Sequence, residues 1–183
     1  VVTGKFSPMS SVWGVSWGGV IKGYNLGVTA KVIQHDLYVQ KTFGTVFDIA
    51  TYLPKVYKDL DVDLALRNFG VAPTFGTFKT KLPTSINVAL TYPYKQWMFY
   101  EQHNIMKNNI TSGFGVSYKY EVKDQGTIFG KAGYFVDEMH NLTYPTFGLD
   151  LKYDRYFIGM SYIYGDETLP VSNTFRLTIN LEI

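Results

Sequence analysis

The sequence predicts an all-β fold, namely an antiparallel transmembrane β-barrel of about 10 to 12 strands. Three observations lead to this prediction. Apolar and polar residues alternate along many segments of about nine to eleven residues, the length that a tilted strand needs to cross a membrane. Tyr and Phe are abundant, with 15 and 13 copies among 183 residues, whereas only 17% of residues are charged. No window contains the roughly 18 consecutive apolar residues of a membrane helix, so this chain could enter a membrane only as strands closed into a barrel.

Eleven segments carry the alternation. They lie at roughly 11–20, 24–35, 42–53, 59–69, 84–93, 96–105, 113–122, 126–136, 146–154, 156–164 and 173–183. Residues Thr3 to Ser7 are a candidate for a twelfth strand, since bacterial single-chain barrels have an even number of strands.

The alternation is clearest in the last segment, where apolar and polar side chains occupy opposite faces. One face holds Phe175, Leu177, Ile179, Leu181 and Ile183, and the other holds Arg176, Thr178, Asn180 and Glu182. The same pattern separates Leu64 from Asp63 and Leu149 from Asp150. We predict that the apolar faces contact lipid and that the polar faces point toward the barrel axis.

The connections between these segments alternate between short and long. Residues 93–95, 123–125 and 154–155 make short connections, whereas 70–83, 106–111, 137–145 and 165–172 make longer ones. Short periplasmic turns alternate with longer extracellular loops in outer-membrane barrels, which predicts a periplasmic C-terminus. The connection at 54–59 departs from the pattern, because it should be short and is not.

Aromatic residues gather beside the short connections. Tyr92, Tyr94 and Trp97 surround one of them, and Tyr153 and Tyr156 surround another. This placement predicts an aromatic girdle at a membrane interface. The alternative is aromatic cross-strand pairing, which soluble sheets also use.

Five short motifs resemble, in the same order, those of the PorV/PorQ group of outer-membrane barrels and its spirochaete relatives, which are FadL-like. The motifs are GTVFDI at 44–49, LALRNFG at 64–70, LPTSIN at 82–87, GKAGY at 130–134 and TFRLTI at 174–179. The resemblance covers about residues 25–183. Lys131 stands where the family tends to have Arg, and Phe175 stands where it tends to have His.

The length of 183 residues predicts that residues 1–183 are a single β-barrel domain. The resemblance implies that this domain forms the C-terminal part of a FadL-like barrel of about 14 strands. It also implies a signal peptide and further strands upstream, and a location in the bacterial outer membrane. The implied roles are transport or binding of hydrophobic ligands, or participation in type IX-like protein secretion. The implied partners are the lipid bilayer, a hydrophobic ligand and other outer-membrane or secretion-machine proteins.

Polar residues of the alternating segments form the candidate site, a lumen-facing network. They are Asp48, Asp61, Asp63, Arg67, Lys131, Asp150, Lys152 and Arg176. Burial of an unpaired carboxylate is costly, so we expect these acids to pair with the basic residues and brace the barrel. A path for a substrate is the alternative, and Asp61 and Asp63 could instead bind calcium.

The sequence gives little support to catalysis, cofactors or nucleic acid binding. The chain has no Cys, which excludes disulfide-stapled folds, thiolate metal sites and cysteine nucleophiles. Its net charge of +2 is too small to indicate a nucleic acid partner. Asp137, Glu138 and His140 could hold a cation weakly, although a solvated loop is the preferred interpretation. We therefore expect a protein that is not an enzyme and has neither cofactor nor metal.

Two alternative functions remain open. The first is a lipid hydrolase embedded in the barrel wall, because Gly14-Val15-Ser16-Trp17-Gly18 matches the GxSxG nucleophile motif and Ser16 could act with His35. That motif requires a strand-to-helix turn, and the alternation around Ser16 favours an ordinary strand. The second is a soluble β-barrel or sandwich that binds an apolar ligand or a partner.

Overall fold

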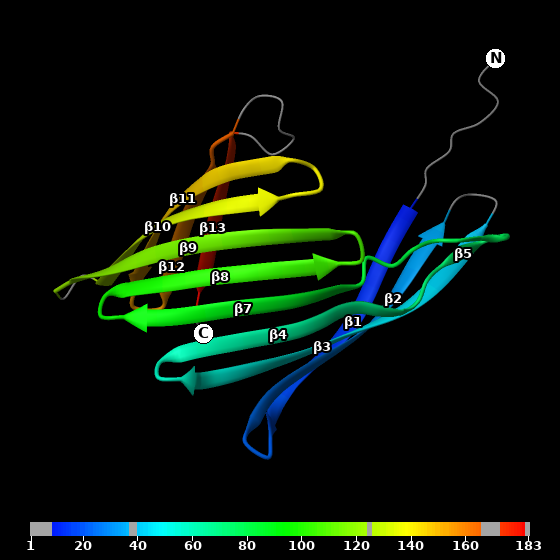
Figure 1. Ribbon diagram of the computed structural model, residues 1–183, viewed down its shortest axis with the longest axis horizontal. Coiled ribbons are helices and arrows are strands. Elements are labelled where there is room, and N and C mark those ends of the chain that lie inside the picture. Colours follow the sequence, from blue (N-terminus) through cyan, green and yellow to red (C-terminus); the bar gives the residue numbers. More distant parts are fainter. Residues whose placement is uncertain (1–8, 37–39, 124–125, 166–172, 182–183) are drawn as a thin grey trace. The chain divides into compact units, whose positions relative to one another are not determined.

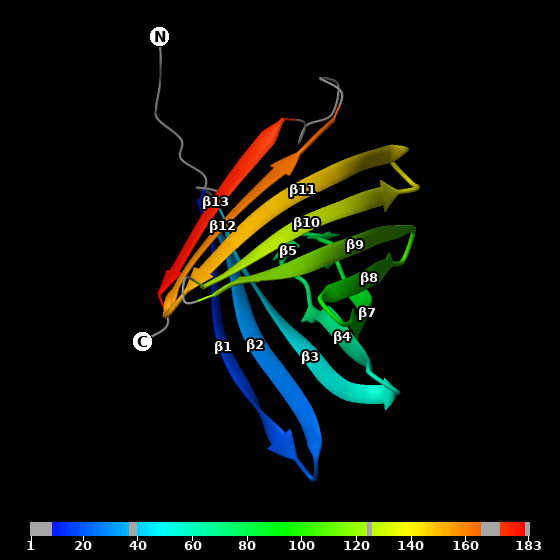
Figure 2. The same ribbon diagram turned by 90° about the vertical axis from the view of Figure 1, so that its left-hand side faces the viewer.

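The computed structural model describes residues 9–36, 40–123, 126–165 and 173–181, and it is all-β. Eleven strands form one antiparallel sheet in which each strand lies beside the next in chain order (Figures 1 and 2). These strands are β1 (Met9–Ile21), β2 (Tyr24–Asp36), β3 (Lys41–Tyr57), β4 (Leu60–Val71), β7 (Ser85–Tyr94), β8 (Trp97–Met106), β9 (Asn109–Val122), β10 (Gly126–Asp137), β11 (Leu142–Tyr153), β12 (Tyr156–Ile163) and β13 (Thr174–Leu181). All eleven predicted strands are confirmed. The candidate strand at 3–7 lies outside the described residues.

The predicted long connection at 70–83 contains two strands that the sequence did not predict. They are β5 (Thr74–Phe75) and β6 (Phe78–Lys79), which pair with each other in a separate two-stranded sheet. Each has only two residues, too few for an alternation to be visible. The described residues contain no helix that could span a membrane.

The chain divides into two compact units. The first comprises Val1–Leu53 and Asp63–Asn87, and the second comprises Pro54–Val62 and Val88–Ile183. The first unit therefore contains β1, β2 and most of β3 and β4. The second contains β8 to β13, with most of β7.

In the first unit, the strand register separates polar from apolar side chains. Thr29 of β2 lies opposite Ser16 of β1 and Asp48 of β3, so these three side chains share one face of the sheet. The next residue, Val28, lies opposite Ile49 on the other face. We name these two sides the polar face and the apolar face.

The strands of the second unit, taken by themselves, show a separation of the same kind. Lys131 lies opposite Ser117 and Gly148, and Gly148 lies opposite Ser161, so these residues share one face of β9 to β12, which we also name a polar face. The residues of β8 to β13 on the apolar face are Trp97, Phe99, Glu101, His103, Ile105, Ile110, Ser112, Phe114, Val116, Tyr118, Tyr120, Val122, Ile128, Gly130, Ala132, Tyr134, Val136, Thr143, Pro145, Phe147, Leu149, Leu151, Tyr153, Tyr156, Ile158, Met160, Tyr162, Phe175, Leu177, Ile179 and Leu181.

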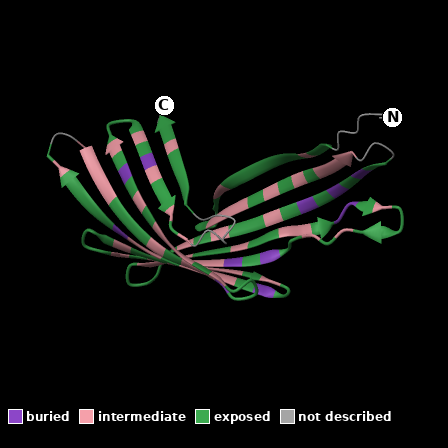
Figure 3. Cartoon of the chain, turned by 90° about the horizontal axis from the view of Figure 1, so that it is seen from above, coloured by how far each residue is buried: buried purple, intermediate pink, exposed green. Residues whose placement is uncertain are grey.

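The side chains of the apolar face are largely uncovered. Leu64, Leu149 and Leu177 are 38%, 40% and 55% exposed, whereas Asp150 on the polar face is only 7% exposed. Figure 3 shows exposed and less exposed residues alternating along the strands. Among the described residues, only Val46, Ala72 and Pro73 are buried apolar side chains. The apolar residues therefore do not gather into a core of the chain itself.

The described connections at one end of the sheet are short, as the sequence predicted near 93–95 and 154–155. Two-residue turns at 22–23, 58–59, 95–96 and 154–155 join strands at one end of the sheet. The predicted connections at 123–125 and 165–172 lie largely outside the described residues. The first residue of each two-residue turn has a φ between +50° and +55°. At the other end, the connections range from the turn at 107–108 to the long segment 72–84.

Three described connections differ from their predicted lengths. The predicted loop at 137–145 is reduced to residues 138–141, because β10 ends at Asp137 and β11 begins at Leu142. The predicted six-residue connection at 54–59 shrinks to Lys58–Asp59, because β3 continues through Pro54 to Tyr57. Lys55 has a φ of +53°, so an irregular position next to Pro54 accommodates a residue that cannot donate to the ladder. The predicted loop at 106–111 was also wrong, because β8 and β9 are joined by the turn Lys107–Asn108 alone.

Asn68 interrupts the alternation of β4 in the same manner. Its φ is +53°, and the ring of the following Phe69 lies 6.0 Å from the ring of Phe47 on the apolar face. Leu66, two residues before Asn68, is also exposed. One extra residue therefore lies between two outward side chains, as at a β-bulge.

Candidate functional site

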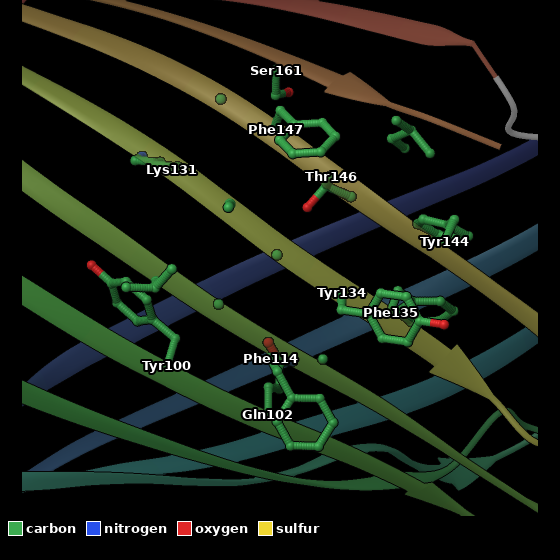
Figure 4. Close-up of a pocket in the computed structure, with 17 residues that line it drawn as sticks. Tyr100, Gln102, Phe114, Lys131, Tyr134, Phe135, Tyr144, Thr146, Phe147 and Ser161 are labelled. Carbon is green, nitrogen blue, oxygen red and sulfur yellow. The ribbon is translucent and has the colours of Figure 1, made fainter.

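A cavity of about 420 Å³ lies on the polar face of the second unit (Figure 4). Its floor contains the glycines Gly113, Gly115, Gly133 and Gly148 of β9, β10 and β11, whose missing side chains leave the space. The side chains of the polar face around it are Tyr100, Gln102, Lys131, Phe135, Tyr144, Thr146, Ser161 and Ile163. Aromatic walls with a few polar groups, at this volume, are typical of small-molecule sites.

Contacts between neighbouring strands order the cavity walls. The rings of Phe135 and Tyr144 stack with their centroids 4.9 Å apart, and the hydroxyls of Tyr100 and Ser117 lie 3.4 Å apart. The ammonium of Lys131 forms an ion pair with the carboxylate of Asp150. Two residues of the predicted network are thus brought together beside the cavity.

A second polar cluster lies in the first unit, around Asp48. The ammonium of Lys31 forms an ion pair with Asp48 and donates a hydrogen bond to Asn68 Oδ1 at 3.1 Å. The backbone N–H of Asn68 donates to Asp48 Oδ1 at 2.8 Å. The sequence identified Asp48 but missed Asn68, because the bulge there reverses the expected alternation. It also missed Lys31, which lies on the neighbouring strand β2.

The remaining residues of the predicted network have varied surroundings. Asp61 accepts a hydrogen bond from the backbone N–H of Lys55 at 2.9 Å. Lys152 is partly exposed on the polar face, whereas Asp63, Arg67 and Arg176 are exposed. A single network of all eight residues stays a prediction.

An acid at the end of β10, Asp137, is hydrogen-bonded to a histidine of the following loop at 138–141. Asp137 Oδ2 lies 2.8 Å from His140 Nδ1, and Asp137 Oδ1 accepts the backbone N–H of His140. The bond from the His140 side chain lowers the pKa of Asp137 below its ordinary value, against the opposing effect of desolvation. Among the described residues, no group of three or more His, Asp or Glu side chains could hold a metal ion.

The structure does not bring Ser16 and His35 together. Ser16 Oγ lies 2.9 Å from Thr29 Oγ1, whereas His35 Nδ1 lies 2.8 Å from Ser10 Oγ. Ser10 and Ser16 are six residues apart on β1, and Gly14 to Gly18 lie inside that strand. The GxSxG match is therefore part of a regular strand and has no strand-to-helix turn.

The apolar face of the second unit carries a different polar cluster. His103 Nδ1 lies 2.9 Å from Ser112 Oγ, and His103 Nε2 lies 2.9 Å from Glu101 Oε1. Glu101 also lines a second cavity, of about 550 Å³, on this face. The apolar-face side chains around that cavity are Leu60, Leu90, Tyr92, Phe99, Phe114, Val116, Ala132 and Tyr134. The sequence analysis missed this cluster, since it assigned Ser112 to no strand.

Comparison with known proteins identified no relative. No protein-family model matches the chain, and no curated protein or solved structure was found to be similar to it.

Proposed function

We propose that this chain is a β-barrel protein of the bacterial outer membrane that binds or transports hydrophobic ligands at the polar-face cavity. The observation that carries this proposal is the uncovered apolar face. It runs along strands such as β1, β2 and β9, which have 13, 13 and 14 residues, whereas ordinary strands have about five or six. Soluble monomers rarely expose contiguous apolar surface of this extent, and lipid tails would cover it.

The side chains beside the two-residue turns also support a membrane location. Basic groups lie over exposed tyrosine rings, with Lys58 over Tyr57 and Lys95 over Tyr94 at 5.3 Å and Arg155 over Tyr156 at 5.9 Å. The three turns belong to the same end of the antiparallel sheet. Amphipathic rings and long basic side chains favour a membrane–water interface, so this end suits the predicted aromatic girdle.

The cavity supports a ligand with an apolar body and one polar end. Tyr100, Phe135 and Tyr144 offer apolar surface, while Gln102 and Lys131 offer hydrogen-bond donors. The motifs that resemble the PorV/PorQ group suggest the same class of hydrophobic cargo. They also suggest a component of type IX-like secretion, but the cavity favours ligand binding.

Extraction tests the membrane location. The full chain, expressed in a Gram-negative host, should stay in the outer-membrane fraction until detergent is added. Its unboiled form should migrate differently from its boiled form on a gel, as folded barrels do. A chain that is folded and monomeric in buffer without detergent would contradict the proposal and favour the soluble alternative.

Cavity filling tests the ligand site. Gly115→Leu would place a side chain in the cavity, where a Cβ at position 115 meets Tyr100 at 3.7 Å. We expect the protein in detergent to bind a fluorescent polyene fatty acid and this variant to bind it at least about tenfold more weakly, a loss of about 1.4 kcal/mol. Gly130→Leu is the matched control, because it lies on the apolar face with nothing within 4 Å of its Cβ. Equal affinity of both variants would contradict the cavity as the binding site.

A further inference from the structure

Glu101, His103 and Ser112 are the exception to the composition of the apolar face. Among the residues of β8 to β13 on this face, Glu101 is the one carboxylate and His103 the one histidine, and none is Lys or Arg. An ionisable side chain that faces lipid is costly, and it usually indicates a functional site. A merely tolerated polar residue would not require a chain of three polar side chains, with His103 hydrogen-bonded to both Ser112 and Glu101.

The sheet register brings the three side chains together. Ser112 of β9 lies directly opposite His103 of β8, and Glu101 lies two residues before His103 on the same face. Hydrogen bonds of 2.9 Å join His103 Nδ1 to Ser112 Oγ and His103 Nε2 to Glu101 Oε1. An ionised Glu101 can only accept, so in the neutral ring Nε2 carries the hydrogen and Nδ1 accepts from the Ser112 hydroxyl. This is the order of groups in a serine–histidine–acid triad.

Packing fixes the orientation of the imidazole. The ring of Phe114 meets the ring of His103 edge to face, at 6.2 Å and 83°. The side chain of His103 is 32% exposed and that of Glu101 is 40% exposed, so a substrate could reach the cluster from the apolar side.

The second cavity lies next to this cluster. Glu101 and Phe114 belong to its lining, and the other side chains around it include Phe99, Val116 and Tyr134. Its volume of about 550 Å³ and its apolar walls suit a flexible hydrocarbon chain.

The depth of the cluster also suits a lipid ester. His103 and Ser112 are each four residues from the turn Lys107–Asn108, which places them roughly 10 Å from the tip of the hairpin at the rise of a tilted strand. The ester bonds of membrane lipids lie at the boundary of the hydrocarbon core and not at its centre.

We propose that Ser112, His103 and Glu101 form the active site of a lipid acyl-ester hydrolase that takes its substrate from the membrane. This inference rests on the proposed membrane location. It differs from the hydrolase alternative suggested by the sequence, because it uses neither Ser16 nor His35.

The reaction follows from the three hydrogen-bonded groups. Ser112 Oγ attacks the ester carbonyl carbon while its proton moves to His103 Nδ1. The bond from that carbon to the alcohol oxygen then breaks, and His103 returns the proton to the leaving alcohol. Water, activated by His103, next attacks the acyl group on Ser112, which releases the carboxylic acid and restores the hydroxyl. Glu101 is a positioning residue that holds the ring and stabilises its transient positive charge.

Hydrolysis of labelled vesicles tests the proposal. The full chain in phosphatidylcholine vesicles with fluorescent acyl chains should release fluorescent fatty acid, and a fluorophosphonate probe should label Ser112. Ser112→Ala and His103→Ala should each lower kcat by about a thousandfold or more. Glu101→Gln should lower kcat and leave KM unchanged, because it keeps the shape of the side chain but removes its charge. Ser16→Ala and His35→Ala are the matched controls and should be fully active.

The gel shift of unboiled samples shows whether each variant is folded. Absence of turnover and of labelling in a folded, membrane-inserted protein would overturn the triad and leave the proposed barrel intact. Turnover that survives Ser112→Ala would overturn it as well. Loss of labelling in Ser16→Ala, with labelling retained in Ser112→Ala, would reinstate the serine of the GxSxG motif as the nucleophile.

Discussion

A few residues hold the backbone of β4 out of regular strand geometry, and Gly70 is the most constrained of them. Its φ is +147°, and a Cβ added there would lie 2.2 Å from the carbonyl oxygen of Thr45. It follows Asn68, whose positive φ forms the bulge beside Asp48. Two features therefore require glycine at this position. One is the positive φ of the backbone, and the other is the close approach of the β3 backbone, which leaves no space for a Cβ.

Gly70→Ala should destabilise the protein by at least about 2 kcal/mol, because strain at the backbone adds to a clash with Thr45. Urea unfolding in detergent, followed by circular dichroism, would measure the loss. Gly130→Ala is the control, since nothing lies within 4 Å of its Cβ, and it should change stability by less than about 0.5 kcal/mol. Similar losses in both variants would contradict this account of Gly70.

Some residues of the candidate sites could be identified from the sequence, and others could not. Lys131 and Asp150 were identified and do pair, because both follow the regular alternation of long strands. Lys31 was missed as the partner of Asp48, since nothing in a single strand indicates which basic residue of the neighbouring strand lies close enough to pair. The contact of His103 with Ser112 was missed for a similar reason.

At the scale of strands and turns, alternation predicted all eleven strands of the sheet, but it could not fix where they end. The segment 113–122 was predicted to begin one residue after Ser112, whereas β9 begins at Asn109. A two-residue turn joins β8 to β9. Ser112 is therefore inside β9, directly opposite His103, and not next to a loop as predicted. An error of four residues at one strand end thus concealed a whole cluster.

The hairpin of β10 and β11 should lose stability in acid. Asp137 lies at the end of β10 beside the loop, outside the part of the strand that we propose crosses the membrane. Its pKa is lowered chiefly by the hydrogen bond from His140, so the ionised form stabilises the folded state above its ordinary pKa. That stabilisation is lost as the pH falls through the lowered value.

His140→Ala should therefore lower the Tm at neutral pH and have little effect once Asp137 is protonated. Thermal unfolding at a series of pH values would measure the difference. His35→Ala provides a histidine control away from this loop, where His35 bonds to Ser10. A Tm difference between His140→Ala and the unmodified protein that does not change with pH would contradict the role of Asp137.

Neighbouring residues of β4 lie on opposite faces of the sheet, which leads to a prediction about which face contacts lipid. Leu64→Arg puts a charge on the apolar face and should cost about 2–4 kcal/mol if that position is near the bilayer midplane. Ala65→Arg, one residue along on the opposite face, should cost less. Unfolding of both variants in lipid vesicles would measure the contrast. Equal losses would refute the assigned faces.

For the whole molecule, the division into a polar and an apolar face explains why so few side chains are buried. Val46, Ala72 and Pro73 are the only buried apolar side chains among the described residues, whereas Asp137, Asp150 and five uncharged polar residues are buried. A soluble sheet reverses this distribution, since it hides apolar side chains from water. This distribution is the one expected of a protein whose outer surface is surrounded by lipid. The alternation of apolar and polar residues in the sequence was sufficient to predict the distribution.

The number of strands in the described sheet limits how the backbone hydrogen-bonding groups of its two edge strands can be paired. Eleven is odd, and neighbouring strands alternate in direction, so β1 and β13 run in the same sense, with one neighbour each. Joining them directly would create a parallel seam with slanted, evenly spaced hydrogen bonds in an otherwise antiparallel cylinder. One intervening strand, from this chain or from another, would make every junction antiparallel. Any odd number of intervening strands has the same effect, and bare amide and carbonyl groups cannot face hydrocarbon, so inside a bilayer these two edges must be paired in one of these ways.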